Sequence, residues 1–266
     1  MTEETAALGE LLSRSSSIVA FTGAGISTES GIRNPESGLP DFRSPGGVWT
    51  RYDPRDFTFD RYVASAEVRA NSWAMRREFL GSVAQPNPAH LALATLQQAG
   101  RLRGVITQNI DGLHQLAGSS NVIEIHGTAR EVMCIGAAPT AGTPRGCGFR
   151  AEHTWALRRV DDGDPDPACP HCGGLVKSAT VSFGQMLFPG VVESAAELVE
   201  QADVVLAIGS SLQVYPAADL PVHGVRSGAR LAIVNDEPTP LDPLAELVVR
   251  GRAGEVLPRA VASALG

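Results

Sequence analysis

The sequence has no long hydrophobic run, no excess of positive charge and few aromatic residues, which make up 5% of its 266 residues. Its apolar stretches are short, such as residues 204–208, whereas a membrane-spanning helix needs roughly 20 apolar residues. The formal net charge of −7 supplies none of the positive field that nucleic-acid binding requires. The acidic residues 1–5 lack the basic and apolar regions of a secretory signal. We therefore expect a cytoplasmic protein with neither a membrane nor a nucleic acid as partner.

Cysteine is scarce and confined to one stretch of the chain. All four cysteines lie between residues 134 and 172, and such clustering in a cytoplasmic protein favours a metal site over disulfides. Cys169 and Cys172 form a C-x-x-C turn followed by two glycines, which presents two thiolates to one tetrahedral zinc. Four thiolates leave no open position for a substrate, so this zinc is expected to be structural. Free or disulfide-linked cysteines are the alternative. The predicted zinc ligands are Cys134, Cys147, Cys169 and Cys172.

Short apolar strands alternate with helices along most of the chain. The predicted strands cover residues 18–21, 104–107, 122–125, 203–208, 230–234 and 246–249. The predicted helices cover residues 3–13, 60–80, 88–99, 191–201, 216–226 and 254–265. Continuous apolar strands that alternate with helices indicate a parallel sheet covered on both faces. We therefore predict an α/β fold with a Rossmann-like parallel sheet and helices on both faces.

Residues 130–185 interrupt this alternation because they are rich in glycine, proline, cysteine and aspartate. Such a composition does not supply a normal strand–helix unit. We predict that this stretch is a small inserted zinc-ribbon module, and that residues 1–129 and 186–266 form the large domain. Part of the helical segment 44–85 is expected to join the small domain.

A glycine-rich loop follows the first predicted strand. Its two glycines, Gly23 and Gly25, would let the backbone approach a phosphate closely and present N–H groups to it. A full dinucleotide fingerprint has a third glycine where this chain has Thr28, so the loop taken alone also fits a tight turn without a ligand. Ligands of parallel sheets bind beyond the carboxyl ends of strands, which is where this loop lies.

Seven motifs occur in order along the chain, at residues 23–27, 40–43, 107–114, 124–127, 183–184, 209–212 and 251–258. With these motifs the chain resembles the sirtuin family, in its short bacterial form, from about residue 11 to residue 258. Several independent motifs in the correct order argue against chance agreement. The resemblance implies a Rossmann-like large domain, a zinc-binding small domain, and NAD in the cleft between them.

The resemblance also implies an activity, that of an NAD-dependent protein-lysine deacylase, or deacetylase. In the family, the acyl-lysine oxygen attacks C1′ of the nicotinamide ribose as nicotinamide leaves. A general base then activates a ribose hydroxyl, and the products are lysine, nicotinamide and O-acyl-ADP-ribose. A histidine suits this task because its pKa lies near neutrality. His126, which follows a strand and precedes Gly127, matches the catalytic histidine of the family. A lone histidine is more often structural, and the surrounding motifs reverse that expectation.

The matching motifs assign further residues to NAD. Asp111 is expected to bind the nicotinamide carboxamide and Asn109 to orient the ribose and a water, with an Asx turn after a strand as the alternative. Gln108 would bind ribose hydroxyls, Phe42 would exclude water from the nicotinamide pocket, and Arg43 would reach the phosphates. The residues expected to contact NAD are Gly23, Ala24, Gly25, Ser27, Asp41, Phe42, Arg43, Gln108, Asn109, Ile110, Asp111, Gly209, Ser210, Ser211, Asn235 and Ala253. We expect the other histidines to be structural, with His171 able to compete as a zinc ligand.

The chain departs from the family pattern at three places. The usual partner position of Cys134 holds Ala137, so we predict that residues 137–146 are an inserted loop and that Cys147 supplies the fourth thiolate. Residues 33–39 lengthen the loop that closes over NAD, which would alter NAD affinity or shield the acyl site. Gln185 stands where the family often has glutamate. Pairing of this region with the substrate backbone as an added strand is nevertheless expected to survive.

Acyl preference is expected to depend on the helix near Trp73. Family members that favour succinyl or malonyl groups carry Tyr-x-x-Arg, whereas this chain has Trp73 and Arg76. Arg76 could pair with an acyl carboxylate, or Arg76 and Arg77 are solvated helix charges. The residues expected to contact substrate are Trp73, Arg76, Val181, Phe183 and Gly184. The expected partners are acyl-lysine proteins or peptides, and we expect a monomer. An acidic surface would attract such basic partners, although charge alone favours the simpler explanation that mild acidity keeps the protein soluble.

Two other functions fit the same scaffold. A mono-ADP-ribosyltransferase would retain NAD cleavage but use a protein side chain as acceptor. A non-catalytic NAD-binding sensor or interaction protein would use the lengthened loop to block substrate. The presence of His126 favours the deacylase.

Overall fold

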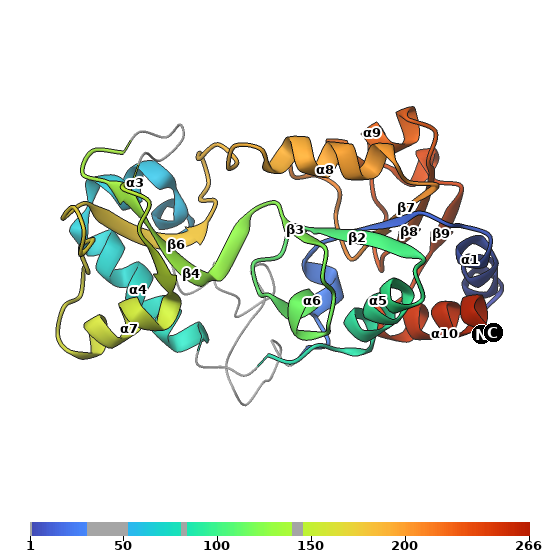
Figure 1. Cartoon of the computed structure of the whole chain (residues 1–266), viewed down its shortest axis with the longest axis horizontal. Coiled ribbons are helices and arrows are strands. Elements are labelled where there is room, and N and C mark those ends of the chain that lie inside the picture. Colours follow the sequence, from blue (N-terminus) through green and yellow to red (C-terminus); the bar gives the residue numbers. More distant parts are fainter. Residues whose placement is uncertain (1, 31–52, 81–83, 140–145) are drawn as a thin grey trace. The chain divides into compact units, whose positions relative to one another are not determined.

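The structure is a computed structural model that describes residues 2–30, 53–80, 84–139 and 146–266. The chain divides into two compact units (Figure 1). Unit 1 comprises Met1–Ser30, Gln85–Ile125 and Gly190–Gly266, and unit 2 comprises Gly31–Ala84 and His126–Pro189. The predicted module, residues 130–185, lies within the segment His126–Pro189 of unit 2 and is a few residues shorter at each end.

Unit 1 contains a six-stranded sheet in the order β3-β2-β1-β7-β8-β9, with parallel pairing throughout. The predicted α/β fold with a parallel sheet is confirmed. Both central strands consist of apolar or β-branched residues that are fully buried, as expected when helices cover both faces. The strands are β1 (Ile18–Thr22), β2 (Leu102–Thr107), β3 (Val122–Glu124), β7 (Val204–Ile208), β8 (Arg230–Val234) and β9 (Leu247–Val249).

Helices lie on both faces of this sheet. In Figure 1, α5 (Pro88–Gln98) and α10 (Ala253–Leu265) lie on one face, and α8 (Val191–Glu200) and α9 (Asp219–Arg226) lie on the other. The first helix, α1 (Glu3–Ser13), packs against α10. Local signals fix where α5 begins, because the Asn87 side chain accepts from two N–H groups of its first turn and Pro88 occupies the first helical position.

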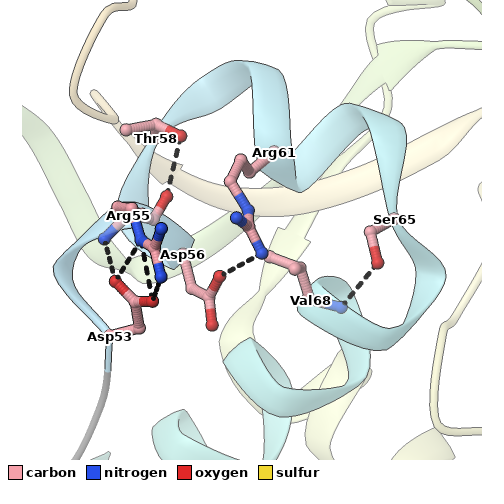
Figure 2. Close-up of polar contacts among 7 residues, drawn as sticks. All are labelled: Asp53, Arg55, Asp56, Thr58, Arg61, Ser65 and Val68. Atoms are coloured by element: carbon pink, nitrogen blue, oxygen red, sulfur yellow. Dashed lines mark hydrogen bonds and ion pairs between the residues drawn. The ribbon is translucent and has the colours of Figure 1, made fainter.

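Two predicted helices have different bounds in the structure. The segment 60–80 is divided into α3 (Phe59–Ala64) and α4 (Ala66–Leu80), because Ser65 is extended, with φ −129° and ψ 119°. The Ser65 hydroxyl then accepts from Val68 N–H at 3.2 Å and helps to start α4, as Figure 2 shows. The predicted helix 216–226 begins only at Asp219. The preceding residues form a turn in which Ala218 N–H donates to the Val214 carbonyl at 2.9 Å.

Unit 2 contains a three-stranded antiparallel sheet in the order β5-β4-β6. Its elements are β4 (Gly127–Gly136), β5 (Arg150–Glu152), α7 (His153–Asp161) and β6 (Leu175–Thr180). Their side chains enclose a small core with α4, made of Trp73, Val132, Cys134, Ala156, Cys169 and Val176. The composition of this stretch concealed its strands, because two of them are only three to six residues long and each follows a glycine-containing segment.

Unit 2 has ion pairs both within one stretch of chain and between its two segments. At η2 (Pro54–Phe57), the Arg55 guanidinium folds back onto the Asp53 carboxylate, and Arg61 pairs with Asp56 at 3.1 Å (Figure 2). These pairs are exposed and contribute little to stability. Arg69 is different because it is buried, bonds bidentately to Asp166 at 2.8–3.0 Å, and also donates to two backbone carbonyls. Its loss would leave buried acceptors unsatisfied.

Short elements complete the described chain. They are η1 (Ala24–Ser27), α6 (Leu113–Leu116) and η3 (Asp242–Leu244). Within the described ranges, no helix has both the length and the apolarity needed to cross a bilayer.

Candidate functional site

Four neighbouring strands of unit 1 end at the same edge of the sheet in polar or glycine-containing segments. In sheet order, β2 leads into Gln108, β1 into Gly23, β7 into Gly209 and β8 into Asn235. Neighbouring strands are about 4.8 Å apart, so these ends extend over about 14 Å. Only an elongated ligand can contact all four.

The two glycine loops pack directly against each other. Gly25 N–H donates to the Gly209 carbonyl at 2.7 Å, and Gly23 N–H donates to the Ile208 carbonyl at 3.0 Å. A side-chain carbon at Gly25 would come within 2.6 Å of Gly209 Cα, and Gly209 itself has φ +58°. The glycines are therefore required by the contact between the β1 and β7 loops.

This contact corrects one prediction from the sequence. The N–H groups of Gly23 and Gly25 were expected to bind phosphate, but they are used by the neighbouring loop. The Gly209 N–H is likewise bonded, to the Val234 carbonyl at 2.9 Å. The reason is steric: two loops this close satisfy each other's backbone groups, which the sequence of either loop alone does not reveal.

We expect Gly25→Ala to destabilise the protein by about 1–3 kcal/mol, the usual effect of overpacking. Its added carbon would meet Gly209 backbone atoms at 2.6–2.9 Å, and backbone atoms yield less readily than a side chain. Urea unfolding followed by circular dichroism measures the change. Ala24→Ser is the matched control, because Ala24 is exposed in the same loop and its substitution should shift stability by less than about 0.5 kcal/mol. Equal stability of the two variants would contradict the packing argument.

A polar network joins η1 to the end of β2. The Ser27 hydroxyl donates to Asp111 Oδ2 at 2.8 Å and accepts from Asn109 Nδ2 at 3.1 Å. The same Asn109 amide donates to the Gly23 carbonyl at 3.1 Å. Three residues predicted to bind NAD thus contact one another, and the network fixes the orientation of the Asn109 and Asp111 side chains.

Two buried histidines stand behind this network. His90 and His114 have ring centroids 4.8 Å apart, and His90 Nε2 lies 3.4 Å from the Ser27 hydroxyl. A hydrogen bond of 2.9 Å joins His114 Nε2 to the Thr22 hydroxyl. Burial lowers the pKa of His90 to about 4, although Asp111 opposes the shift, and burial lowers the pKa of His114 to about 3. Both rings are therefore neutral at pH 7.

Both histidines were expected to be structural, and their burial agrees with that expectation. The contact of His90 with Ser27 and the link from Asn87 to the glycine loop were not expected from the sequence. The Asn87 side chain donates to the Ile26 carbonyl at 2.6 Å and to the Ser30 hydroxyl at 3.0 Å. The available signal was the Asn-Pro-x-His sequence at a helix start, which places Asn87 and His90 on the same turn.

The remaining predicted NAD residues of unit 1 lie around the same edge. Gln108 Nε2 donates to the Ser210 hydroxyl at 2.7 Å, which joins the ends of β2 and β7. Asn235 is half-buried at the end of β8, where its amide donates to the Glu237 carbonyl at 2.8 Å. Ala253 is the first residue of α10 and is buried. Ile110 and Ser211 are half-buried, and Ala24 is exposed.

His126 is the first residue of the second segment of unit 2. Its carbonyl accepts from Val181 N–H at 2.8 Å, and its side chain is half-buried. The segment after β6 contains three of the predicted substrate residues, Val181, Phe183 and Gly184. Phe183 is 60% exposed although its carbonyl accepts from Phe59 N–H at 2.9 Å, and Gly184 is exposed with φ +76°. An exposed phenylalanine beside a glycine turn presents apolar surface that a partner chain could cover.

Trp73 does not lie where a substrate contact requires it. Its indole is 1% exposed and packs in the core of unit 2 against Cys134 and Cys169. Its Nε1 is buried without a hydrogen-bond partner among the described residues. Arg76, one turn further along α4, is half-buried, and burial lowers its pKa. We therefore assign Trp73 to the support of α4 and retain only Arg76 as a candidate for acyl contact.

The four predicted thiolates come together in unit 2. All four Sγ atoms lie within 4.8 Å of one another, and two of the pairs are 3.5 Å apart. Tetrahedral zinc with Zn–S distances of about 2.3 Å requires S–S separations of about 3.8 Å. The cluster therefore fits one zinc ion. His171 makes an edge-to-face contact with Phe149, with ring centroids 5.1 Å apart, and is not part of the cluster.

Two close glycine contacts accompany the approach of Cys147 to the cluster despite the predicted insertion at residues 137–146. Gly146 packs so closely on Cys134 that an added side-chain carbon would lie 1.9 Å from its carbonyl oxygen. Gly174 packs in the same way on Gly136, with a contact of 2.6 Å. Gly146, the last residue of the predicted insertion, thus lies beside the end of β4, from which the insertion begins.

Some predicted features lie outside the described residues. They are Asp41, Phe42, Arg43 and the lengthened loop at 33–39. Most of the insertion at 137–146 also lies there, except residues 137–139 and 146.

The chain matches known proteins over most of its length. The model of the Sir2 family matches residues 23–216. The "NAD-dependent protein deacetylase 2" of Streptomyces coelicolor is 45% identical over 246 residues, which are 91% of this chain and 95% of that protein. A structure described as "Structural Basis for the Mechanism and Regulation of Sir2 Enzymes" has a TM-score of 0.81 at 38% identity, covering 100% of this chain and 99% of the other. A second, "Sir2-p53 peptide-NAD+", has a TM-score of 0.78 at 37% identity and covers 95% of each chain.

Proposed function

Since the chain belongs to the Sir2 family, we propose that it is an NAD-dependent protein-lysine deacylase that forms nicotinamide and O-acyl-ADP-ribose. One observation supports this function most: the connected Ser27, Asn109 and Asp111 side chains at the carboxyl edge of a parallel sheet. The related S. coelicolor protein is named a deacetylase, and a similar Sir2 structure contains a peptide and NAD⁺.

The residues of unit 1 suit an extended dinucleotide. Polar groups at four adjacent strand ends extend over about 14 Å, and the residues directly after β1 and β7 are glycines, which carry no side chain. In this proposal, Asp111 and Asn109 bind the nicotinamide end, Gln108 and Ser210 the ribose next to it, and Asn235 the adenosine end. NAD supplies the ADP-ribose group that accepts the acyl chain.

Ser27 would keep the Asp111 carboxylate in one orientation, because its hydroxyl donates to Oδ2 at 2.8 Å. Asp111 Oδ1 accepts from Leu113 N–H at 3.0 Å, so both oxygens are held before a ligand arrives. The neutral His90 and His114 behind them add no competing positive charge. Such preorganisation lowers the cost of orienting a bound carboxamide.

His126 would act as the general base and take a proton from a ribose hydroxyl. Val181, Phe183 and Gly184 would receive the substrate backbone as an added strand. Arg76 would contact the far end of the acyl chain, where a carboxylate would pair with its guanidinium. The partners are then acyl-lysine peptides or proteins.

The four thiolates of unit 2 would bind one structural zinc, with no position left for a substrate. Unit 1 would be the NAD-binding domain, and unit 2 the small zinc-binding domain. We further propose a cytoplasmic monomer.

The test is incubation of the zinc-loaded chain with NAD and an acetyl-lysine peptide, followed by mass spectrometry. Peptide-dependent formation of nicotinamide and O-acetyl-ADP-ribose in equal amounts is the expected result. ADP-ribose attached to protein would instead indicate a mono-ADP-ribosyltransferase. NAD that stays intact in the presence of butyryl, succinyl and acetyl peptides would contradict both enzymatic functions.

A further inference from the structure

Lys177 is the only lysine of the sequence, and it is buried. It lies on β6 opposite Met133 of β4, and 2% of its surface is exposed. Its Nζ donates to the Ser178 carbonyl at 3.2 Å, to Gln185 Oε1 at 3.3 Å and, at a shorter distance, to the Thr180 carbonyl. An ammonium group has three N–H donors, so all of them are used.

No carboxylate balances this charge: among the described residues, the ion pairs do not include Lys177. The titratable groups near it are Arg76 of α4 and Tyr62 of α3, whose hydroxyl donates to the Val176 carbonyl at 2.7 Å. Arg69 pairs with Asp166 instead. Burial, and to a lesser extent the like charge of Arg76, lowers the pKa of Lys177 to about 7.

The ammonium closes the turn that follows β6. Gln185 Oε1 accepts from Ser182 N–H at 3.1 Å as well as from Lys177, and Gln185 N–H donates to the Ser182 carbonyl at 3.0 Å. The Gln185 side chain is 9% exposed, and its Nε2 has no partner among the described residues. The turn therefore uses the oxygen of this amide as an acceptor. The Lys177 ammonium, which can only donate, favours the orientation in which Oε1 faces it.

The same backbone fixes the start of β4. Val181 N–H donates to the His126 carbonyl at 2.8 Å, and Gly127 pairs with Thr180. Gly127 is so close to β6 that an added side-chain carbon would lie 2.1 Å from the Ala179 carbonyl oxygen. A movement of the β6 end therefore moves the His126 backbone with it.

We propose that Lys177 is a positioning residue whose buried ammonium holds residues 181–185 ready for a substrate strand and fixes the backbone of His126. The proposal rests on the proposed function for the roles of this turn and of His126. Gln185 is neutral, so it does not offset the effect of burial on the pKa of Lys177 as a carboxylate would. The ammonium therefore loses its proton near neutral pH. A neutral amine has two N–H donors for three acceptors, so the turn loosens as the pH rises above 7.

Biosynthetic labelling with [¹³Cε]lysine tests the charge directly, because a chain with one lysine gives one signal. The signal should titrate with a midpoint near pH 7 in the parent protein. In Gln185→Glu the midpoint should rise by about one unit or more, since a carboxylate next to an ammonium favours its charged form. A midpoint near that of an exposed lysine in the parent protein would overturn the proposal.

Lys177→Met removes the ammonium, and Gln185→Met removes one acceptor while leaving β6 intact. In both, amide exchange at Ser182 should quicken about tenfold or more, as expected when a charge-assisted hydrogen bond is lost. The KM for an acetyl-lysine peptide should rise by a similar factor while the KM for NAD stays constant. In the parent protein, the peptide KM should rise with pH along the lysine titration, and in Gln185→Glu this rise should occur at higher pH.

Arg150→Met is the matched control, because it removes an exposed cation from β5, which pairs with β4 and not with β6, and should change none of these quantities. Unchanged exchange and peptide KM in both folded variants would overturn the proposal. So would equal increases of the peptide and NAD KM values with a lower melting temperature, since that pattern reports a purely structural role. If the parent protein forms no O-acyl-ADP-ribose, the proposed function fails, while the titration and exchange measurements still test the position of Lys177.

Discussion

His126→Ala is expected to lower kcat for deacylation by about 10²–10⁴-fold, the range for loss of a general base. The His126 side chain is half-buried, and the Val181 N–H bonds to its backbone carbonyl, which alanine retains. The fold of unit 2 should therefore persist. A discontinuous assay of O-acetyl-ADP-ribose, together with a thermal unfolding curve, separates the loss of activity from a loss of structure.

His153→Ala provides the control for this prediction. His153 belongs to the same unit, and its ring Nδ1 lies 3.2 Å from the Arg130 carbonyl oxygen. Its substitution should leave kcat within about twofold. A His126→Ala enzyme with the full parental rate would contradict the assignment of the base.

Removal of zinc should have the largest effect on stability. Structural zinc sites contribute about 10–16 kcal/mol in zinc-finger peptides, which equals or exceeds the whole stability of a typical domain. Cys169→Ala should therefore reduce bound zinc from one equivalent to nearly none and unfold unit 2. Metal analysis by mass spectrometry gives the zinc content.

Tryptophan fluorescence reports which unit unfolds. All three tryptophans lie in the sequence segments of unit 2, and Trp73 belongs to the same buried core as Cys134 and Cys169. A red shift in Cys169→Ala, with the circular dichroism of the unit 1 sheet largely retained, is the expected result. His171→Ala, between two ligands but outside the cluster, should keep one equivalent of zinc. Full zinc content in Cys169→Ala, or its loss in His171→Ala, would refute the ligand set.

Sequence periodicity predicted unit 1 well because its strands are buried on both faces and read as continuous apolar runs. The predicted bounds of α1 and β8 agree with the structure to the residue. Periodicity failed in unit 2, where β5 has three residues and the small core is built partly from the cysteines Cys134 and Cys169. The break at Ser65 was also missed, because nothing in the helical pattern of residues 60–80 marks an extended residue.

In the candidate site, too, the sequence predicted positions along the chain but not the contacts between distant segments. The strand-end position of Asn109 and Asp111 follows from the chain alone, whereas their contacts with Ser27 depend on the order of β1 and β2 in the sheet. The role of the glycines was mistaken for the same reason: the contact between Gly25 and Gly209 joins loops that are far apart in sequence. Trp73 was assigned by its position in a motif, and only its burial assigns it to the core.

The central claim is that the end of β2 binds the nicotinamide end of NAD through Asp111, held by Ser27 at 2.8 Å. Calorimetric titration of the parent protein and of Asp111→Asn with NAD and with ADP-ribose tests it most directly. The parent should bind both ligands, and Asp111→Asn should lose affinity for NAD about tenfold or more while binding ADP-ribose as before. No heat with either ligand in the parent protein, or equal losses for both ligands in the variant, would contradict the claim.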